Sequence, residues 1–346
     1  MNKILYRDDS YLVNCEIVNP NSIYFITFSS WHSKYHYSKP LGFSREFGGD
    51  AFRPLGLNVI RVISSRNDWY ANNSIEQALL AAKEAVGDNL SITYGSSMGG
   101  YAALKFYEFL EASFFISISP QHSLTKAYMN EIGDKRWEEE VLFYQDKITA
   151  PEFASSDPFG VIIFDSKHKS DNLHAKSYAQ FRNIKYIDIE YSGHPSGKII
   201  NKNYGLKNII SKVSEVIKRP KHEAEKDIDL LCMEIINSHK SSNLYKFTTA
   251  KNIQEIALIY RDLEPNQLTY QLIKNFFYRK DFSILHVYLG CLILNENVDK
   301  FLGKTKFSKV LLERFSAIAK LNKIDITRFL VKRLLDANPA IQGDCT

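Results

Sequence analysis

One short stretch of the sequence, Gly95–Gly99, constrains the possible fold more than any other. It reads Gly-Ser-Ser-Met-Gly and matches the pattern Gly-x-Ser-x-Gly, in which a sharp strand-to-helix turn lifts a serine above the edge of a sheet. The pattern is informative only in context, since Gly and Ser are common enough for it to arise by chance. Here a β-prone run at 90–94 precedes it, and apolar residues at helical spacing follow it over 100–110. The stretch therefore predicts a strand, a turn and a helix, with Ser97 as a nucleophile and the Met98 backbone N–H facing an oxyanion.

Strand and helix patterns alternate from residue 22 to residue 217. Runs rich in β-branched and aromatic residues predict strands at Ser22–Phe28, Leu57–Ile63, Leu90–Tyr94, Phe114–Ser119, Val161–Phe164 and Ile184–Glu190. Helical spacing lies between and after them, at Ser74–Val86, Gly100–Leu110, Asn172–Arg182 and Leu206–Ile217. We expect residues 1–20 to form a hairpin or loop, and 121–158 to form a lid over the site. This alternation predicts an α/β fold, with residues 1–217 forming a mostly parallel sheet that has helices on both faces.

The composition changes after residue 217. Residues 218–226 are rich in charge and contain Pro220, which predicts a linker. Beyond it, strand patterns give way to apolar residues at helical spacing, so residues 227–346 are expected to form an all-α domain with a loose C-terminal tail. We favour a packing or partner-binding module as the interpretation of this second domain.

The bulk properties indicate a soluble cytoplasmic protein. The chain has 346 residues, of which 45% are hydrophobic and 24% are charged, and its net charge is +5. Basic residues between 198 and 226 alternate with apolar ones, which favours a solvated helix face over a nucleic-acid site. The four cysteines have no disulfide-framework or metal-site spacing, so reduced thiols are expected. The N-terminus lacks the apolar core of a secretory signal, and the longest apolar run, 283–294, is too short to cross a bilayer.

A serine nucleophile needs a base within hydrogen-bond reach, and His194 is the candidate. It lies in the loop 191–195, between a glycine and a proline, just after the strand predicted at 184–190. In sheets with such an elbow the partners follow in the order serine, acid, histidine, and His194 satisfies this order. Two other histidines, His168 and His174, lie in the loop expected to carry the acid, and later ones fall outside the sheet domain.

Two aspartates compete for the role of the acid that orients the histidine. Asp165 directly follows the strand at 161–164, whereas Asp171 lies further along the same loop, where the next helix begins. Each also suits a structural role, loop anchoring for Asp165 and helix N-capping for Asp171. We favour Asp171, because a triad acid has to reach the Nδ1 atom of the histidine from beyond the strand end.

A second oxyanion donor is expected at the corner that follows the strand at 22–28, and Ser29 is the residue that we select. Aromatic and polar residues come from the same corner and from the loop after the next strand. The candidates for pocket walls among them are Trp31, His32 and Asn67–Tyr70. Of these, Trp31, Trp69 and Tyr70 have rings of the kind that stack on a sugar.

Taken together, these features resemble the α/β-hydrolase superfamily and, more narrowly, bacterial proteins from glycan and capsule loci. The resemblance spans roughly residues 20–217 and is carried by Ile26–Ser29, Gly95–Tyr101, Ser119–Gln121, Asp171–His174 and Gly193–His194. Some proteins with this pattern are polysaccharide O-acetyltransferases that use the same triad. The resemblance thus implies a serine mechanism and adds weight to Asp171. The chain differs from lipase and esterase relatives in lacking a His-Gly-Gly-Gly motif, which argues against ordinary lipase function.

The leading hypothesis is a serine hydrolase that cleaves a small acyl ester through an acyl-enzyme on Ser97, with His194 as base and Asp171 as its orienting acid. The alternative is an O-acyltransferase that passes the acyl group to a hydroxyl of a bacterial surface glycan. A third hypothesis is an inactive hydrolase-fold scaffold whose helical domain binds a protein partner, although the complete set of three residues argues against it. Neither a cofactor nor a metal is expected. The expected substrate is a small acyl ester or an acylated glycan, not a nucleic acid.

Overall fold

The computed structural model describes residues 2–43, 47–48, 51–154, 158–242 and 245. Its contacts divide the chain into two compact units, Met1–Lys240 and Ser241–Thr346. The helices and the loose tail that the sequence predicts after residue 245 lie outside the described residues. Among the described residues, no helix is both long and apolar enough to cross a membrane.

An eight-stranded sheet forms the centre of the first unit, in the order β1-β2-β4-β3-β5-β6-β7-β8. The strands are β1 (Asn2–Arg7), β2 (Tyr11–Glu16), β3 (Tyr24–Phe28), β4 (Asn58–Ser64), β5 (Ser91–Ser96), β6 (Phe114–Ile118), β7 (Gly160–Phe164) and β8 (Ile184–Asp188). The pairs from β4 through β3 and on to β8 are parallel, whereas β2 is antiparallel to both of its neighbours. The residues predicted as a hairpin or loop therefore form the hairpin β1–β2, which extends one edge of the sheet.

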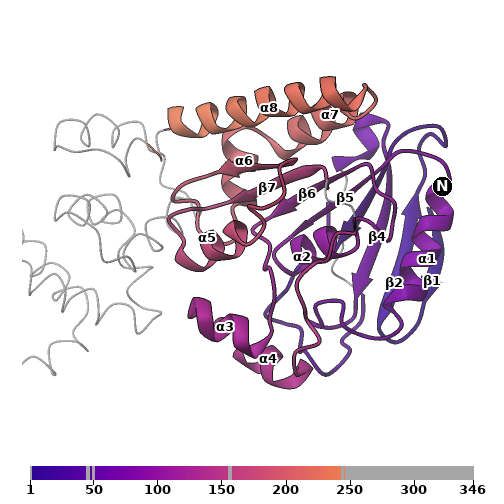
Figure 1. Ribbon diagram of the computed structural model, residues 1–346. Coiled ribbons are helices and arrows are strands. Elements are labelled where there is room, and N and C mark those ends of the chain that lie inside the picture. Colours follow the sequence, from indigo (N-terminus) through magenta and orange to yellow (C-terminus); the bar gives the residue numbers. More distant parts are fainter. Residues whose placement is uncertain (1, 44–46, 49–50, 155–157, 243–244, 246–346) are drawn as a thin grey trace, which may run out of the picture. The chain divides into compact units, whose positions relative to one another are not determined.

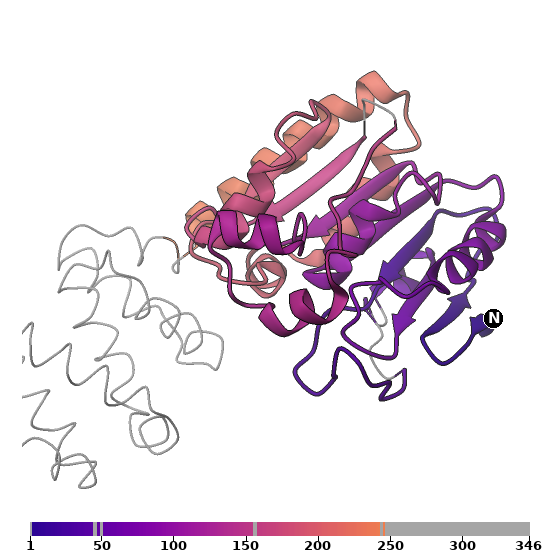
Figure 2. The same ribbon diagram turned by 60° about the horizontal axis from the view of Figure 1, so that its bottom comes forward.

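Helices cover both faces of this sheet. They are α1 (Ile75–Val86), α2 (Met98–Lys105), α3 (Lys126–Ile132), α4 (Glu138–Tyr144), α5 (Lys169–Lys176), α6 (Gly197–Asn203), α7 (Leu206–Val216) and α8 (Lys221–Ser241). Figure 1 shows α7 and α8 on one side of the sheet, with α2 and α5 on the other, and the orange α8 again lies on one side of the sheet in the turned view of Figure 2. Of the helices, α1, α2 and α5 contact the strands most extensively. Every residue of β3, β4, β5, β6 and β7 is buried, as expected for the strands of a parallel sheet that is covered on both faces. The α/β fold predicted from the sequence is confirmed.

The end of the first unit differs from the expected linker at 218–226, because α8 begins at Lys221. Pro220 lies between α7 and α8 and contributes to the start of the second helix. Its carbonyl accepts hydrogen bonds from Glu223 and Ala224 N–H, at 2.9 and 3.0 Å, and so opens the next helix, a position where proline is tolerated. The helix then buries one apolar face, which consists of Ala224, Ile228, Leu231, Cys232 and Ile235.

Polar contacts also join α8 to the elements beneath it. His239 Nε2 lies 2.8 Å from the carbonyl oxygen of Glu190, and Tyr204 donates to Glu234 at 2.8 Å. On β8, Lys185 forms an ion pair with Asp229 at 2.9 Å. The compact unit accordingly continues to Lys240 and does not end at residue 217.

This packing predicts the shortest stable fragment of the chain. A fragment of residues 1–242 is expected to be soluble and to unfold cooperatively, whereas a fragment of residues 1–219 loses α8 and exposes the apolar surface beneath it. Burial of one Leu or Ile side chain contributes about 1.5–3 kcal/mol, so removing the whole face costs a large part of a typical domain's stability. Urea unfolding followed by circular dichroism measures the difference. A soluble 1–219 fragment with the midpoint of the longer one would contradict the assignment of α8 to this unit.

Candidate active site

The register of the parallel strands brings the chain segments that follow them to one edge of the sheet. Phe28 of β3 pairs with Gly95 of β5, and the next residue of β5, Ser96, pairs with Ile118 of β6. Further along, Phe164 of β7 pairs with Asp188 of β8. Ligand sites of open parallel sheets lie at this carboxyl edge, so the loops after β3, β5, β7 and β8 are brought to the place where a site is expected.

Ser97 occupies the turn between β5 and α2 with a backbone φ of +55°. This left-handed conformation is unfavourable for a residue with a side chain, and it persists only where the surrounding structure enforces it. Two backbone hydrogen bonds do so. The Ser97 N–H donates to Ile118 O at 2.8 Å, and the Ser97 carbonyl accepts from Tyr101 N–H at 2.9 Å. The predicted strand–turn–helix unit is present, and its serine is held by the neighbouring strand and by its own helix.

The two glycines of the elbow are required because the backbones approach too closely for side chains. A Cβ atom on Gly95 would lie 2.1 Å from the carbonyl oxygen of Gly99. A Cβ atom on Gly99 would lie 2.4 Å from the carbonyl oxygen of Phe28, at the end of β3. The pattern Gly-x-Ser-x-Gly is thus a packing requirement of β3, β5 and α2.

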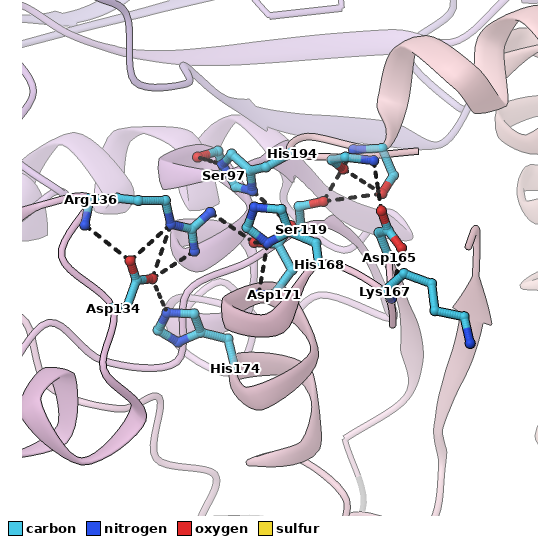
Figure 3. A network of polar contacts seen from close by, with 12 residues as sticks. Ser97, Ser119, Asp134, Arg136, Asp165, Lys167, His168, Asp171, His174 and His194 are labelled. Carbon is cyan, nitrogen blue, oxygen red and sulfur yellow. Dashed lines mark hydrogen bonds and ion pairs between the residues drawn. The ribbon is translucent and has the colours of Figure 1, made fainter. Parts of the chain in front are cut away.

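The three predicted triad residues lie in one hydrogen-bonded line, shown in Figure 3. Ser97 Oγ lies 2.9 Å from His194 Nε2, and His194 Nδ1 lies 2.8 Å from Asp171 Oδ2. A carboxylate only accepts, so the proton belongs on Nδ1 and Nε2 is left to accept the proton of the serine hydroxyl. The geometry is that of a nucleophile, a base and an orienting acid.

Asp171 is the acid that the structure places against the histidine. It lies in the first turn of α5, and its side chain is 0% exposed. Its Oδ1 atom also contacts Arg136 Nη1 at 2.9 Å and His168 Nδ1 at 3.1 Å. Burial raises the pKa of a carboxyl group, but here the charge of His194 and the hydrogen bonds from the two histidines outweigh burial. The pKa of Asp171 therefore lies well below its usual range, and the carboxylate is ionised near neutral pH.

Asp165 has a different role, because it holds the loop that carries the histidine. One of its oxygens accepts from Tyr191 N–H at 2.9 Å and from Lys167 N–H at 2.8 Å, and the other accepts from Gly193 N–H at 2.7 Å. The N-cap residue of α5 is His168 and not Asp171, and the Nδ1 atom of His168 lies 3.3 Å from the backbone nitrogen of Asp171. Both aspartates thus act on His194, one directly and the other through the backbone of its loop.

A group of serines fixes the other end of the histidine loop. Ser196 N–H donates to Ser119 Oγ at 3.2 Å, and Ser192 Oγ donates to Ser196 Oγ at 2.7 Å. Ser119 follows β6 and has a positive φ of +47°. The loop of His194 is therefore anchored to the ends of both β6 and β7.

The two expected oxyanion donors differ in their surroundings. Met98 N–H lies in the first turn of α2, where backbone N–H groups have no acceptor within the helix. Ser29 N–H, by contrast, donates to Val62 O at 3.3 Å, and so it continues the hydrogen bonding of the sheet. The next residue, Ser30, is joined to the elbow, since its hydroxyl donates to Ser96 O at 2.8 Å. In this conformation Ser29 does not offer its N–H to the site, because the parallel pairing with β4 extends one residue beyond the predicted strand end.

The aromatic residues found near His194 differ in part from those predicted to line the pocket. Trp69 and Tyr70 are 1% and 2% exposed, so neither ring has a free face on which a sugar would stack. Trp137, which the sequence analysis did not single out, has its ring centroid 6.3 Å from that of His194. Trp31 is half-buried, with its ring 5.3 Å from that of Trp137, and its Nε1 donates to Glu140 at 2.8 Å.

Sequence reasoning missed several residues around the triad. Arg136 and Trp137 lie between α3 and α4, in the segment that was predicted only as a lid. His168 lies in the loop expected to carry the acid and has no predicted role, yet its ring centroid lies 6.0 Å from that of His194. No spacing or motif marks these residues, because their contacts are made by segments distant in sequence.

No protein-family model and no curated protein matches the sequence. Among solved structures, the chain is similar to a capsule O-acetyltransferase of Neisseria meningitidis serogroup A, with 16% identity, a TM-score of 0.45, and coverage of 59% of this chain and 92% of that one. It is also similar to an esterase of Pyrococcus furiosus, with 12% identity, a TM-score of 0.39, and coverage of 61% and 90%. These likenesses concern the backbone, and the chemistry of this chain has to be inferred from its own residues.

The first unit has the α/β-hydrolase fold. In its strand order β4 lies between β2 and β3, and the elbow follows β5, near the middle of the sheet. The acid and the histidine then follow β7 and β8, in the order that this fold uses.

The different roles of the two aspartates predict different losses on substitution. Asp171→Asn is expected to lower turnover of a short acyl ester by about 10⁴-fold, because an amide group favours the wrong imidazole tautomer. Asp165→Asn is expected to cost far less turnover and to lower the melting temperature, since it weakens the anchoring of the histidine loop. Steady-state kinetics and thermal unfolding of both variants measure the contrast. A larger loss of turnover for Asp165→Asn would transfer the role of triad acid to Asp165.

Proposed function

We propose that this chain cleaves small acyl esters through a covalent acyl-enzyme on Ser97. The observation that carries the proposal is the continuous hydrogen-bonded line from Ser97 through His194 to the buried Asp171, with distances of 2.9 and 2.8 Å. The serine stands at the strained turn between β5 and α2, where its hydroxyl is directed to the carboxyl edge of the sheet.

In the first half of the reaction, His194 Nε2 takes the proton from Ser97 Oγ as that oxygen attacks the ester carbonyl carbon. A tetrahedral intermediate forms, and its oxyanion lies by the first turn of α2, where Met98 N–H is the proposed donor. The intermediate collapses, the bond to the leaving alcohol breaks, and the imidazolium returns its proton to that alcohol. Asp171 stays ionised throughout and stabilises the imidazolium while it exists.

In the second half, the same groups act on an incoming hydroxyl. His194 takes a proton from water, the resulting oxygen attacks the acyl carbonyl, and a second tetrahedral intermediate forms. Its collapse releases the carboxylic acid and returns the proton to Ser97 Oγ. No further group is required, because the base and the oxyanion donor are regenerated in each half.

An alternative is transfer of the acyl group to a hydroxyl of a glycan, and the burial of the triad favours it. Ser97 is 5% exposed, and the side chains of His194 and Asp171 are 14% and 0% exposed. Since bulk water has a concentration of about 55 M, a transferase has to shield its acyl-enzyme and hold the acceptor close to it. Trp137 lies beside His194, with the ring of Trp31 packed against it, and both rings contribute to such shielding.

The first test is covalent labelling. A fluorophosphonate probe is expected to label Ser97, and Ser97→Ala is expected to abolish labelling and to lower turnover by about 10⁴–10⁶-fold while the protein stays folded. Mass spectrometry of the labelled peptide identifies the residue, and circular dichroism checks the fold. The neighbouring Ser96→Ala is the matched control and should remain labelled. A wild-type protein that resists labelling would favour the inactive scaffold, and labelling that survives Ser97→Ala would exclude the proposed nucleophile.

The second test separates water from another acceptor. We expect measurable hydrolysis of p-nitrophenyl acetate and little hydrolysis of long-chain esters, because the ring of Trp137, backed by Trp31, restricts the space beside His194. Release of the acyl group is followed with and without capsule or lipopolysaccharide glycans. Acyl groups that appear on the glycan, together with suppressed hydrolysis, would replace the esterase by the transferase.

A further inference from the structure

Arg136 joins the segment between β6 and β7 to the triad acid. Its Nη1 atom donates to Asp171 Oδ1 at 2.9 Å, as Figure 3 shows. Its Nη2 atom donates to Asp134 Oδ2 at 2.7 Å, and its Nε lies 3.0 Å from both Asp134 oxygens. The side chain of Arg136 is 24% exposed, whereas the side chains of Asp134 and Asp171 are 1% and 0% exposed. One partly exposed cation thus bridges two buried carboxylates.

The second carboxylate is itself tied to the helix that carries the triad acid. His122 N–H donates to His174 Nδ1 at 2.9 Å, so this nitrogen is an acceptor and the ring proton lies on Nε2. The Nε2 atom then donates to Asp134 Oδ2 at 3.3 Å. His174 is fully buried in α5, and burial lowers its pKa, so the ring is neutral at physiological pH. Arg136 is therefore held between two carboxylates that are both fastened to α5.

The contacts divide the oxygens of Asp171 between different partners. Oδ2 contacts His194 Nδ1, and Oδ1 contacts Arg136 and His168. A carboxylate that rotates freely offers either oxygen to the histidine in a range of directions. The planar guanidinium is fixed by its several contacts to Asp134, and from there a single N–H, on Nη1, donates to Oδ1 and restricts this freedom.

We propose that Arg136 is a positioning residue that orients Asp171 and, by its positive charge, sets the lowest pH at which His194 works as a base. This inference rests on the proposed serine mechanism, since it concerns the reactivity of Ser97. It gives the segment between β6 and β7 a part in the chemistry besides covering the site.

The direction of the charge effect follows from electrostatics. The positive charge of Arg136 offsets part of the negative charge that His194 meets at Asp171, and it thus disfavours the imidazolium form. Without Arg136 the imidazolium is more stable, so the free base needed for attack forms only at higher pH. The acidic limb of the pH–rate profile is therefore expected to move to higher pH.

Other titratable groups lie on the elements around the triad, and they remain in a variant of Arg136. They are His168 and His174 on the acid loop and α5, Asp134 between α3 and α4, Asp165 after β7, and the ion pair of Lys167 with Glu190. Asp134 loses its cation in the variant but keeps the hydrogen bond from His174, and its negative charge, no longer offset by Arg136, also favours the imidazolium. The loss of the Arg136 charge and the negative charge of Asp134 therefore both move the acidic limb to higher pH.

The experiment compares Arg136→Met with Arg136→Lys and with the control Lys135→Met, which removes the same charge from an exposed neighbour in the same segment. The readouts are the rate of fluorophosphonate labelling of Ser97 and kcat for p-nitrophenyl acetate, both as functions of pH. Arg136→Met is expected to move the acidic limb upward by about one pH unit, and to lower kcat by at least about tenfold on that limb with little change of KM. Lys135→Met is expected to match the wild type.

Arg136→Lys separates charge from geometry. A lysine keeps the cation but lacks the planar fork, so the acidic limb should stay in place while kcat falls several-fold at all pH values. If Arg136→Met does not fold, the double variant Asp134→Asn, Arg136→Met removes the ion pair without a net change of charge and is expected to show the same upward shift, reduced in size.

The outcomes distinguish this inference from the proposed function. A wild-type protein without labelling or turnover contradicts the serine mechanism itself. A wild type with normal labelling, together with an Arg136→Met variant whose acidic limb has not moved, overturns the role of Arg136 alone. An Arg136→Lys variant with the kcat and the acidic limb of the wild type would overturn the orienting role of the planar guanidinium. An equal shift of the acidic limb in Lys135→Met would show that the shift depends only on the net charge of the protein, and would overturn the specific role of Arg136.

Discussion

The close approach of three backbone segments at the elbow is the constraint on which the rest of the structure depends. The first turn of α2 lies against the ends of β3 and β5, and neither Gly95 nor Gly99 has room for a side chain there. This packing holds Ser97 in its left-handed conformation and directs its hydroxyl and the first N–H groups of α2 to the same edge of the sheet. Backbone packing therefore fixes the position of Ser97, and the surrounding loops place their side chains around it.

The second constraint is a balance of buried charge. Asp171 and Asp134 are two carboxylates almost without contact to solvent, and Arg136 is the cation between them. Two negative charges and one positive charge leave a net charge of −1 beside His194, which suits a ring that becomes positive during the reaction. A buried carboxylate without such partners would take up a proton and lose its function. The same contacts therefore keep Asp171 ionised and limit how strongly it attracts the imidazolium.

Local sequence patterns pointed to three residues, in a recognisable turn and in loops after strands, that lie together in the structure. Ser97 was predicted from its glycines and the flanking strand and helix, and the structure gives the physical reason for those glycines. His194 and Asp171 were predicted from chain order and from the loops in which they lie, and they meet at hydrogen-bond distances. Ser29, by contrast, does not offer its N–H to the site in this conformation, because that N–H donates to Val62 of β4. Where the pairing of two strands ends depends on the neighbouring strand and not on the run of apolar residues in β3.

The sequence by itself determined the alternation of strands and helices, the elbow, and the order of serine, acid and histidine, because periodicity and turn chemistry act over a few neighbouring residues. Only the tertiary structure decided what surrounds them. It brought Arg136 and Trp137, from a segment without a pattern, to the acid and to the histidine. It also joined α8 to the first unit, where composition alone indicated a linker at its start. The physical reason is that buried charge pairs and helix packing depend on residues distant in sequence, which become neighbours only when the sheet and its covering helices have formed.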